Sequence, residues 1–241
     1  MPRKRSRAGR RRYPANNPDP FLKKYLSKLD NFFFGRFKDH YVKALGKELD
    51  GCTSVLDVGC GSASPLRHFK GTIEYSVGVD SFRSSIDQSR GAGIHHEYAL
   101  MNALDISGRF PNGSFDCVVA LDVLEHLTKD DGHKLLRMME RIARKKIIIF
   151  APNGFVEQGG INGNLDQVHL SGWGVGEMRR MGYRVTGING WKLLRGELAR
   201  VRGWPGDFWW RISLLSEYIT THCPEHAFAL LCVKEKRAEE P

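Results

Sequence analysis

Short apolar runs alternate along the chain with longer amphipathic segments. The runs have the length of β-strands, whereas the segments between them repeat their apolar positions at helical spacing. We expect strands at Ser54–Val58, Tyr75–Asp80, His95–Leu100, Asp116–Leu121, Lys146–Ala151, Tyr183–Ile188 and Ala227–Val233. We expect helices at Ala63–Phe69, Ser81–Arg90, Lys129–Arg144 and Val175–Met181. Continuous apolar strands that alternate with helices predict a doubly wound α/β fold, in which a mostly parallel sheet has helices on both faces.

Three segments depart from this alternation. Residues 21–50 place aromatic and aliphatic side chains at helical spacing, which predicts an N-terminal helical segment docked on the edge of the core, with a lid over a pocket as the alternative. Gly154–Gly172 is rich in Gly, Asn and Gln and has no period, so we expect a functional loop there. From Trp191 to His222 a helical region interleaves tryptophans with arginines. That mixture suits a surface for an anionic or aromatic ligand, or a core with a charged rim.

The formal charge of +10 is concentrated at the N-terminus. Residues 1–12 hold seven lysines and arginines and no acid, so the remainder of the chain carries a formal charge of only +3. With the prolines and asparagines that follow, this composition predicts a disordered basic tail over residues 1–20. Nucleic acid bound through residues 3–12, anionic lipid, and a merely solvated or targeting segment are the alternatives for its role. A second charged tail is expected at residues 235–241.

Composition excludes several other classes of protein. Hydrophobic residues make up 41% of the chain, enough for a sizeable core, and no uncharged apolar run of about 18 residues or secretory signal occurs, so we expect no membrane span. The five cysteines form no Cys-x-x-Cys pair and the nine histidines are dispersed, which predicts free thiols and no metal site. These features indicate a cytoplasmic protein, with peripheral association at a membrane surface as an alternative. They leave the oligomeric state open.

The stretch Val55–Gly61 carries the clearest chemistry in the sequence. A short apolar strand passes at once into a Gly-x-Gly turn, and ligands of open α/β sheets bind at the carboxyl ends of the strands. Glycines let a ligand approach the backbone, while Asp80, which ends the next strand, can accept hydrogen bonds from ribose hydroxyls. Ser64 stands where a dinucleotide-binding turn would have its third glycine. Asp57 would repel a diphosphate, so the turn favours a nucleoside with a cationic, amino-acid-like end.

Four blocks of sequence resemble the class I S-adenosylmethionine-dependent methyltransferases, in particular their small stand-alone domains. In order and at the spacing of that family, the blocks are Val55–Gly61, Val77–Asp80, Asn102-Ala103 and Phe115–Leu127. The resemblance covers residues 50–190 well and the flanks poorly. It implies a Rossmann-like seven-stranded sheet with the last strand antiparallel. It also implies a methyltransferase domain over residues 51–234, with a substrate-specific insert at about residues 191–222.

The resemblance further implies which residues bind S-adenosyl-L-methionine. Asp57, Gly59 and Gly61 would hold its methionine part, Asp80 its ribose, and Asn102 and Ala103 its adenine, while Asp122 would line the methyl-transfer pocket. Cys60 and Ser81 would also bind the cofactor. Asn102 replaces the usual Asp of the family, but its amide oxygen is still a hydrogen-bond acceptor.

An acceptor that must lose a proton needs a general base, and two histidines are candidates. His169 lies at the end of the irregular loop, whereas His126 follows Glu125 in the fourth-strand block, where capping or packing is the alternative role. Around them we expect four side chains to contact the acceptor: Asn153, Asn164, Gln167 and Trp173.

The predicted function is S-adenosylmethionine-dependent methyl transfer to a small-molecule or lipid-linked acceptor. Two alternatives stay open. One is a methyltransferase that acts on RNA or protein through the basic tail, and the other is a non-catalytic module that binds the cofactor without turning over an acceptor.

Overall fold

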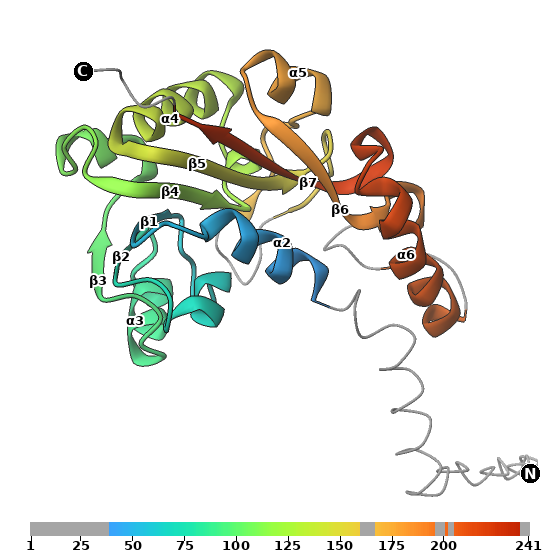
Figure 1. Ribbon diagram of the computed structural model, residues 1–241, viewed down its shortest axis with the longest axis horizontal. Helices are drawn as coiled ribbons and strands as arrows, with labels where there is room; N and C mark the ends of the chain where they lie inside the picture. The colour runs from blue at the N-terminus through green and yellow to red at the C-terminus, as the bar shows by residue number, and fades with distance from the viewer. Residues whose placement is uncertain (1–38, 160–166, 196–200, 202–204, 237–241) are drawn as a thin grey trace, which may run out of the picture. The chain divides into compact units, whose positions relative to one another are not determined.

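Seven strands form one sheet in the part of the chain that the computed structural model describes, which is residues 39–159, 167–195, 201 and 205–236. The strands are β1 Ser54–Val58, β2 Tyr75–Asp80, β3 Glu97–Leu100, β4 Phe115–Leu121, β5 Ala143–Pro152, β6 Arg184–Trp191 and β7 Ala227–Glu235. Their order is β3-β2-β1-β4-β5-β7-β6, and β7 runs antiparallel to both of its neighbours while the pairs from β3 to β5 are parallel. The predicted sheet with its antiparallel last strand is confirmed (Figure 1).

Helices and short 3₁₀ turns connect these strands. They are α2 His40–Leu49, η1 Pro65–Phe69, α3 Arg83–Gly91, η2 Ala103–Gly108, η3 Leu124–His126, α4 Lys129–Ile142, α5 Val175–Arg180, η5 Lys192–Leu194, α6 Gly206–Thr220 and η7 Pro224–His226. Side-chain caps mark two of the starts: the Ser64 hydroxyl accepts the Leu66 N–H before η1, and the Thr128 hydroxyl accepts the Asp131 N–H before α4.

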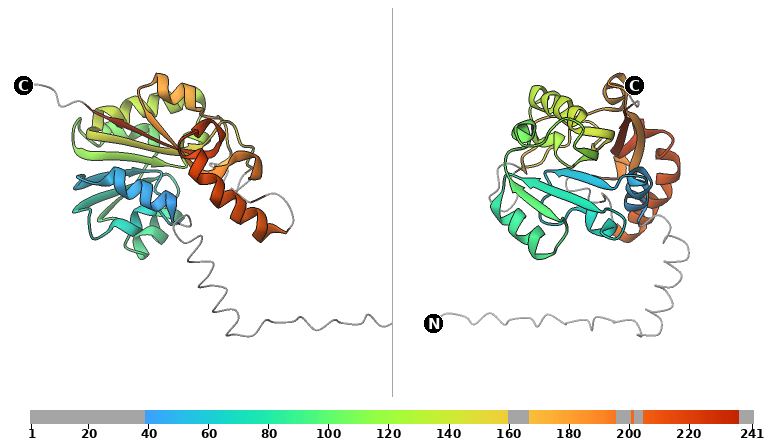
Figure 2. Two further views of the ribbon diagram at one scale, coloured as in Figure 1. Left: turned by 45° about the vertical axis from the view of Figure 1, so that its right-hand side comes forward. Right: turned by 60° about the vertical axis from the view of Figure 1, so that its left-hand side comes forward.

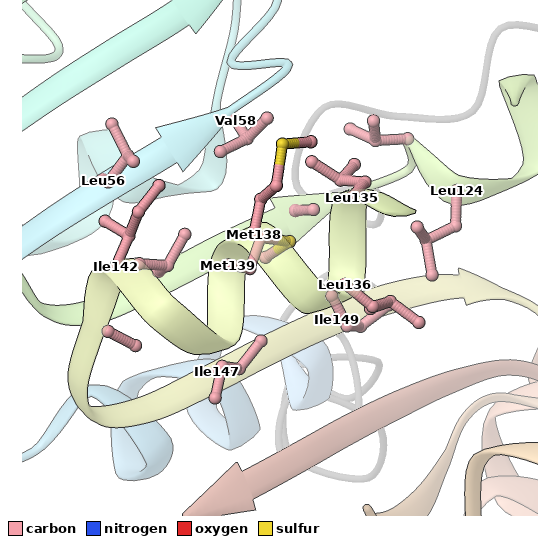
Figure 3. Packing of buried hydrophobic residues seen from close by; sticks show 14 of the residues in the cluster. Leu56, Val58, Leu124, Leu135, Leu136, Met138, Met139, Ile142, Ile147 and Ile149 are labelled. Atoms are coloured by element: carbon pink, nitrogen blue, oxygen red, sulfur yellow. The ribbon is translucent and has the colours of Figure 1, made fainter. Parts of the chain in front are cut away.

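The apolar strands bury both faces of the sheet because successive side chains point to opposite sides. On β5, Ile147 and Ile149 join the core under α4, whereas Ile148 and Phe150 join the core that contains the buried face of α2. Figure 3 shows the first core, in which side chains of α4 lie against β1 and β5, and Figure 2 gives two further views of the layers. A strand covered on both sides has no polar face, which explains the continuous apolar runs in the sequence.

The helix predicted at Lys129–Arg144 ends earlier than expected. α4 stops at Ile142, and β5 already begins at Ala143. The Arg144 and Lys145 side chains both reach the Asp116 carboxylate on β4, at 3.0 and 3.1 Å, so this tertiary contact holds their backbone in the sheet. Local spacing alone favoured the helix.

The N-terminal helical segment and the Trp/Arg-rich region are described only in part. α2 docks through Leu45 and Leu49, and the Tyr41 ring lies 4.2 Å from that of Phe150. Residues 21–38 lie outside the described residues, as do 196–200 and 202–204 of the Trp/Arg-rich region. Of the helices that the structure describes, none combines the length and the apolar character that a bilayer-spanning segment requires.

The Asp116 carboxylate should make stability depend on acid pH. Its burial opposes ionisation, but hydrogen bonds from the Thr53 N–H, Lys145 and Arg144 outweigh that effect and lower the pKa of Asp116 to about 2. Because the unfolded pKa is about 3.9, this stabilisation is complete above roughly pH 5 and is lost as the pH falls toward 2.

We therefore expect Asp116→Asn to lower the free energy of unfolding by about 2 kcal/mol at pH 7, and by much less at pH 2. Urea unfolding at several pH values measures both quantities. The matched control is Asp87→Asn, because Asp87 is exposed and pairs only with the exposed Arg90 among the ion pairs of the described chain. An equal loss for Asp116→Asn at both pH values would contradict the assignment.

Candidate active site

The Gly-x-Gly turn closes the carboxyl end of β1 at the point where the strand order reverses, between β1 and β4. Gly59 and Gly61 both have positive φ, at 72° and 57°. A Cβ on Gly59 would lie 2.5 Å from a methyl carbon of Val123, in the loop after β4, so this position excludes any larger residue. The Gly59 and Cys60 N–H groups donate to the Val79 carbonyl at 2.7 and 2.9 Å, which ties the turn to β2.

Asp80 faces this turn from the end of β2. Its two carboxylate oxygens accept the Gly61 N–H at 2.9 Å and the Phe82 N–H at 2.8 Å. An ionised carboxylate is acceptor-only, so it can bind a backbone N–H group on each of its two oxygens. The carboxylate therefore fixes the turn and is oriented by it.

Asp57 lies beneath the turn rather than in a cavity. Its side chain is 1% exposed, and its Oδ2 accepts the Ser64 hydroxyl at 2.6 Å and lies 3.3 Å from Nε2 of the buried His95. Cys60 is also buried under the turn, and burial raises the pKa of its thiol. Ser64 thus occupies the third-glycine position with a structural task, since its hydroxyl links Asp57 to η1. Neither this task of Ser64 nor the contact of His95 with Asp57 follows from the sequence pattern.

A first cavity, of about 210 Å³, opens beside the turn at the carboxyl ends of β1 and β2. Six of the residues predicted to bind the cofactor line it: Gly59, Gly61, Asp80, Ser81, Asn102 and Ala103. Val79, Ser85, Val123, His126, Leu127 and Gln167 complete its wall. The Asn102 amide oxygen accepts the Leu104 N–H at 2.8 Å and caps η2, so one of its two lone pairs is already used.

A second cavity, of about 300 Å³, adjoins the first. Its lining is Asp122, Glu125, His126, Phe150, Pro152, Val156, Gln158, Gln167, His169, Asn189, Phe228 and Ala229. His126 and Gln167 line both cavities, so the two spaces share a wall. We call the first space the turn cavity and the second the acidic cavity, because two carboxyl groups lie in the latter.

The acidic cavity is built around Asp122 and Glu125. Asp122 has a φ of 57°, an uncommon conformation for a residue other than glycine, which turns its side chain toward the cavity after β4. Asp122 is exposed and lines the acidic cavity. Burial raises the pKa of Asp122 to about 6, although a hydrogen bond with Glu125 lowers it. Burial and the charge of Asp122 also raise the pKa of Glu125.

Both candidate base histidines border this cavity, and their ring centroids lie 4.9 Å apart. His169 is brought there by the backbone, because the carbonyl oxygen of Glu125 accepts the N–H groups of Leu170 and Ser171 at 2.7 and 3.1 Å. The irregular loop is therefore anchored to η3 just after His169. Glu125 accepts these hydrogen bonds through its backbone carbonyl and lines the cavity with its side chain, but it was not among the predicted site residues. Its place directly before His126 was the only signal in the sequence.

The predicted acceptor contacts divide between cavity and core. Gln167 lines both cavities, while Asn153 donates through its amide nitrogen to the carbonyls of Pro224, Glu225 and Ala227. Trp173 is 1% exposed, and its indole N–H donates to the Leu124 carbonyl at 3.1 Å. The structure thus places Trp173 in the core, because its ring fills the space over α4. Asn164 lies outside the described residues.

The acidic cavity continues outward into a wider hollow of about 780 Å³. Val156 and Phe228 line both spaces, and the hollow adds exposed Phe155 and Leu193 together with Lys192 and Arg195. Three residues of the Trp/Arg-rich region thus line this hollow. A larger hollow, of about 940 Å³, lies near Arg137 and Lys234, at the other end of the parallel strands, away from these groups.

Solved structures share this fold. A methyltransferase structure described as SAM dependent, from Archaeoglobus fulgidus, is 21% identical over 88% of this chain and 100% of that one, with a TM-score of 0.56. A chain from the complex of the Haloferax volcanii Trm112 methyltransferase activator with a putative methyltransferase is 16% identical over 91% and 99%, with a TM-score of 0.55. The methyltransferase domain of bacterial CtHen1-CN is 15% identical over 83% and 100%, with a TM-score of 0.52. At these identities the likeness is one of fold.

Residues 56–150 match the family described as "Methyltransferase domain". They run from β1 to β5 and include the Gly-x-Gly turn, Asp80 and Asp122. The chain therefore contains a methyltransferase domain, and its fold is that of an S-adenosylmethionine-dependent methyltransferase structure. No curated protein matches the chain.

The cofactor of this methyltransferase domain is S-adenosyl-L-methionine. The turn cavity fits such a ligand. Gly61 has open space where a Cβ would stand, and Asp80 lines the cavity beside it. The neighbouring backbone can thus be approached closely without displacing a side chain.

Proposed function

We propose that this methyltransferase domain is catalytic and that it methylates a nucleophile bound in the acidic cavity. The observation that carries the proposal is the wall shared by the two cavities at His126 and Gln167. A cofactor in the turn cavity and an acceptor in the acidic cavity would meet there. Methyl transfer needs this adjacency, because catalysis of an in-line displacement rests on proximity and alignment.

The cofactor contacts follow from the lining of the turn cavity. Asp80 would accept hydrogen bonds from the ribose hydroxyls, with Ser81 beside it, while Gly59 and Gly61 would leave room for the methionine part. Asn102 and Ala103 would border the adenine. Asp57 and Cys60 would act from beneath, by holding the shape of the turn.

S-adenosylmethionine supplies a methyl carbon on a sulfonium, and the bond to sulfur breaks as the bond to the acceptor forms. The acceptor gives up a proton, so the products are the methylated acceptor, S-adenosylhomocysteine and one proton. The polar residues of the acidic cavity would take that proton and orient the acceptor: Asp122, Glu125, His126 and His169. Apolar Phe150 and Phe228 would restrict water on the opposite wall.

A small-molecule or lipid-linked acceptor agrees best with the size of these spaces. The acidic cavity holds about 300 Å³, the scale of a small ligand, and it opens toward exposed Phe155 and Leu193 beside Lys192 and Arg195. An acceptor with an apolar body and an anionic group would match that combination.

A screen for methyl acceptors with radiolabelled cofactor tests the function. We expect label from S-adenosylmethionine to enter a pool of small molecules or lipids in a time-dependent manner. A variant that lacks residues 1–12 should label the same pool equally well.

The other outcomes favour the alternatives. Label in RNA or protein that is lost on deletion of residues 1–12, with steep salt dependence, would favour the macromolecular acceptor. Binding of S-adenosylhomocysteine without labelling of any pool would contradict the catalytic proposal.

A further inference from the structure

One group of side chains in the acidic cavity has the composition of a metal site. Glu125, His126 and His169 each place a ligand atom within 4.8 Å of the others. Across the described ranges, no second group of three His, Cys, Asp or Glu side chains meets this condition. The residues come from η3 and from the end of the irregular loop, so the cluster is a product of the fold.

Both imidazoles are oriented as ligating histidines are. The His169 Nδ1 lies 2.5 Å from the Val156 carbonyl oxygen, and the His126 Nδ1 lies 3.3 Å from that of Val168. A carbonyl oxygen only accepts hydrogen bonds, so each Nδ1 carries the proton and each Nε2 carries the lone pair. Hydrogen bonds of this kind to backbone carbonyls fix the tautomer and the ring angle of histidines that bind metals.

Glu125 supplies a carboxylate with unused acceptor capacity. Its side chain is 2% exposed, and no hydrogen-bond donor of the described chain reaches its Oε2. The neighbouring Asp122 is itself an acid, so it adds negative charge to the same cavity. A buried carboxylate without a counter-charge is costly, and a bound cation removes that cost.

We propose that Glu125, His126 and His169 bind a divalent first-row transition-metal ion of the Zn²⁺, Co²⁺ or Mn²⁺ type. Two imidazole nitrogens and one carboxylate oxygen suit these ions, whereas Mg²⁺ and Ca²⁺ prefer oxygen ligands throughout. Ligand atoms at about 2.1 Å from a metal lie roughly 3.4 Å apart, so the three side chains close by about 1 Å on binding. The dispersed histidines of the sequence had suggested no metal site.

The site would also define how the acceptor is activated, a step that rests on the proposed function. Three protein ligands leave a coordination position open toward the acidic cavity, where an acceptor oxygen would bind. A metal-bound hydroxyl has a lowered pKa and loses its proton more readily. Ligating histidines cannot act as general bases, so Asp122 would be the group left to receive that proton.

Metal binding by the full-length, tag-free chain tests the proposal without any assay of activity. After treatment with a chelator, the protein is titrated with Zn²⁺ in calorimetry and with Co²⁺ in visible absorption. We expect one ion per chain and Co²⁺ bands typical of nitrogen and oxygen ligands. His169→Gln should weaken the affinity for Zn²⁺ by at least about 100-fold.

His68→Gln is the matched control, because His68 is exposed on η1 and should leave Zn²⁺ affinity unchanged. Glu125→Gln is a second variant, for which we expect the same loss of Zn²⁺ affinity. Thermal unfolding and the binding of S-adenosylhomocysteine are measured for each variant to show that it is folded. The absence of saturable Zn²⁺ binding by the wild type would overturn the site. Zn²⁺ binding that both variants retain would also overturn it, because the ion would then bind elsewhere, for example at the exposed Cys223. Failure to bind S-adenosylhomocysteine would instead contradict the cofactor assignment and leave the metal result standing.

Discussion

Asp80→Ala is expected to lower the affinity for S-adenosylhomocysteine by at least about 100-fold, because hydrogen bonds to a charged group contribute about 1.5–3 kcal/mol each and a ribose would make two. The substitution also leaves the N–H groups of Gly61 and Phe82 without their acceptor. The turn would therefore loosen at the place where the cofactor approaches the backbone. Calorimetry with S-adenosylhomocysteine measures the affinity.

Asp80→Asn separates the two effects of the carboxylate. An amide retains one acceptor oxygen, so we expect an affinity between those of the wild type and Asp80→Ala. Asp87→Ala is the control, since this carboxylate is exposed on α3 and lies outside the lining of both cavities. Wild-type affinity in Asp80→Ala, with an unchanged melting temperature, would show that the ribose contact is absent.

Asp122→Asn is expected to reduce methyl transfer by about 100-fold, which is the usual contribution of a positioned acid–base group. Asparagine tolerates positive φ, so the backbone at 57° should be preserved while the charge is removed. Asp122 lines the acidic cavity and not the turn cavity, so the affinity for S-adenosylhomocysteine should stay within about threefold of the wild type. Transfer of label to the acceptor pool found with the wild type measures the rate.

Asp105→Asn is the control for this second substitution. Asp105 is an exposed carboxylate on η2, outside both cavities, so both the rate and the affinity should be unchanged. A rate for Asp122→Asn within fivefold of the wild type, or a loss explained entirely by weaker cofactor binding, would contradict an acceptor-side role.

Predictability from sequence differed between the two cavities. The residues of the turn cavity sit at strand ends next to one another in the sheet, so the strand pattern and the Gly-x-Gly turn were enough to bring Gly59, Asp80 and Asn102 together. Parallel strands place their carboxyl ends at one edge of the sheet, so a motif at each strand end predicts a shared site.

The acidic cavity could be predicted only in fragments. His126 and His169 were both candidates, but nothing in their spacing placed their rings 4.9 Å apart. Their meeting depends on the anchoring of Leu170 and Ser171 to the Glu125 carbonyl. Such a contact joins segments more than 40 residues apart, and an irregular loop has no period from which it could be inferred.

The sequence by itself determined the doubly wound sheet and the Gly-x-Gly turn with Asp80 beyond it. These features follow from patterns that are local or that repeat at each strand. Only the tertiary structure decided that Asp57 lies under the turn, that Trp173 belongs to the core, and that Glu125, His126 and His169 form one cluster. The direction of a side chain and the end point of an irregular loop are set by packing between distant segments, which a local pattern does not record.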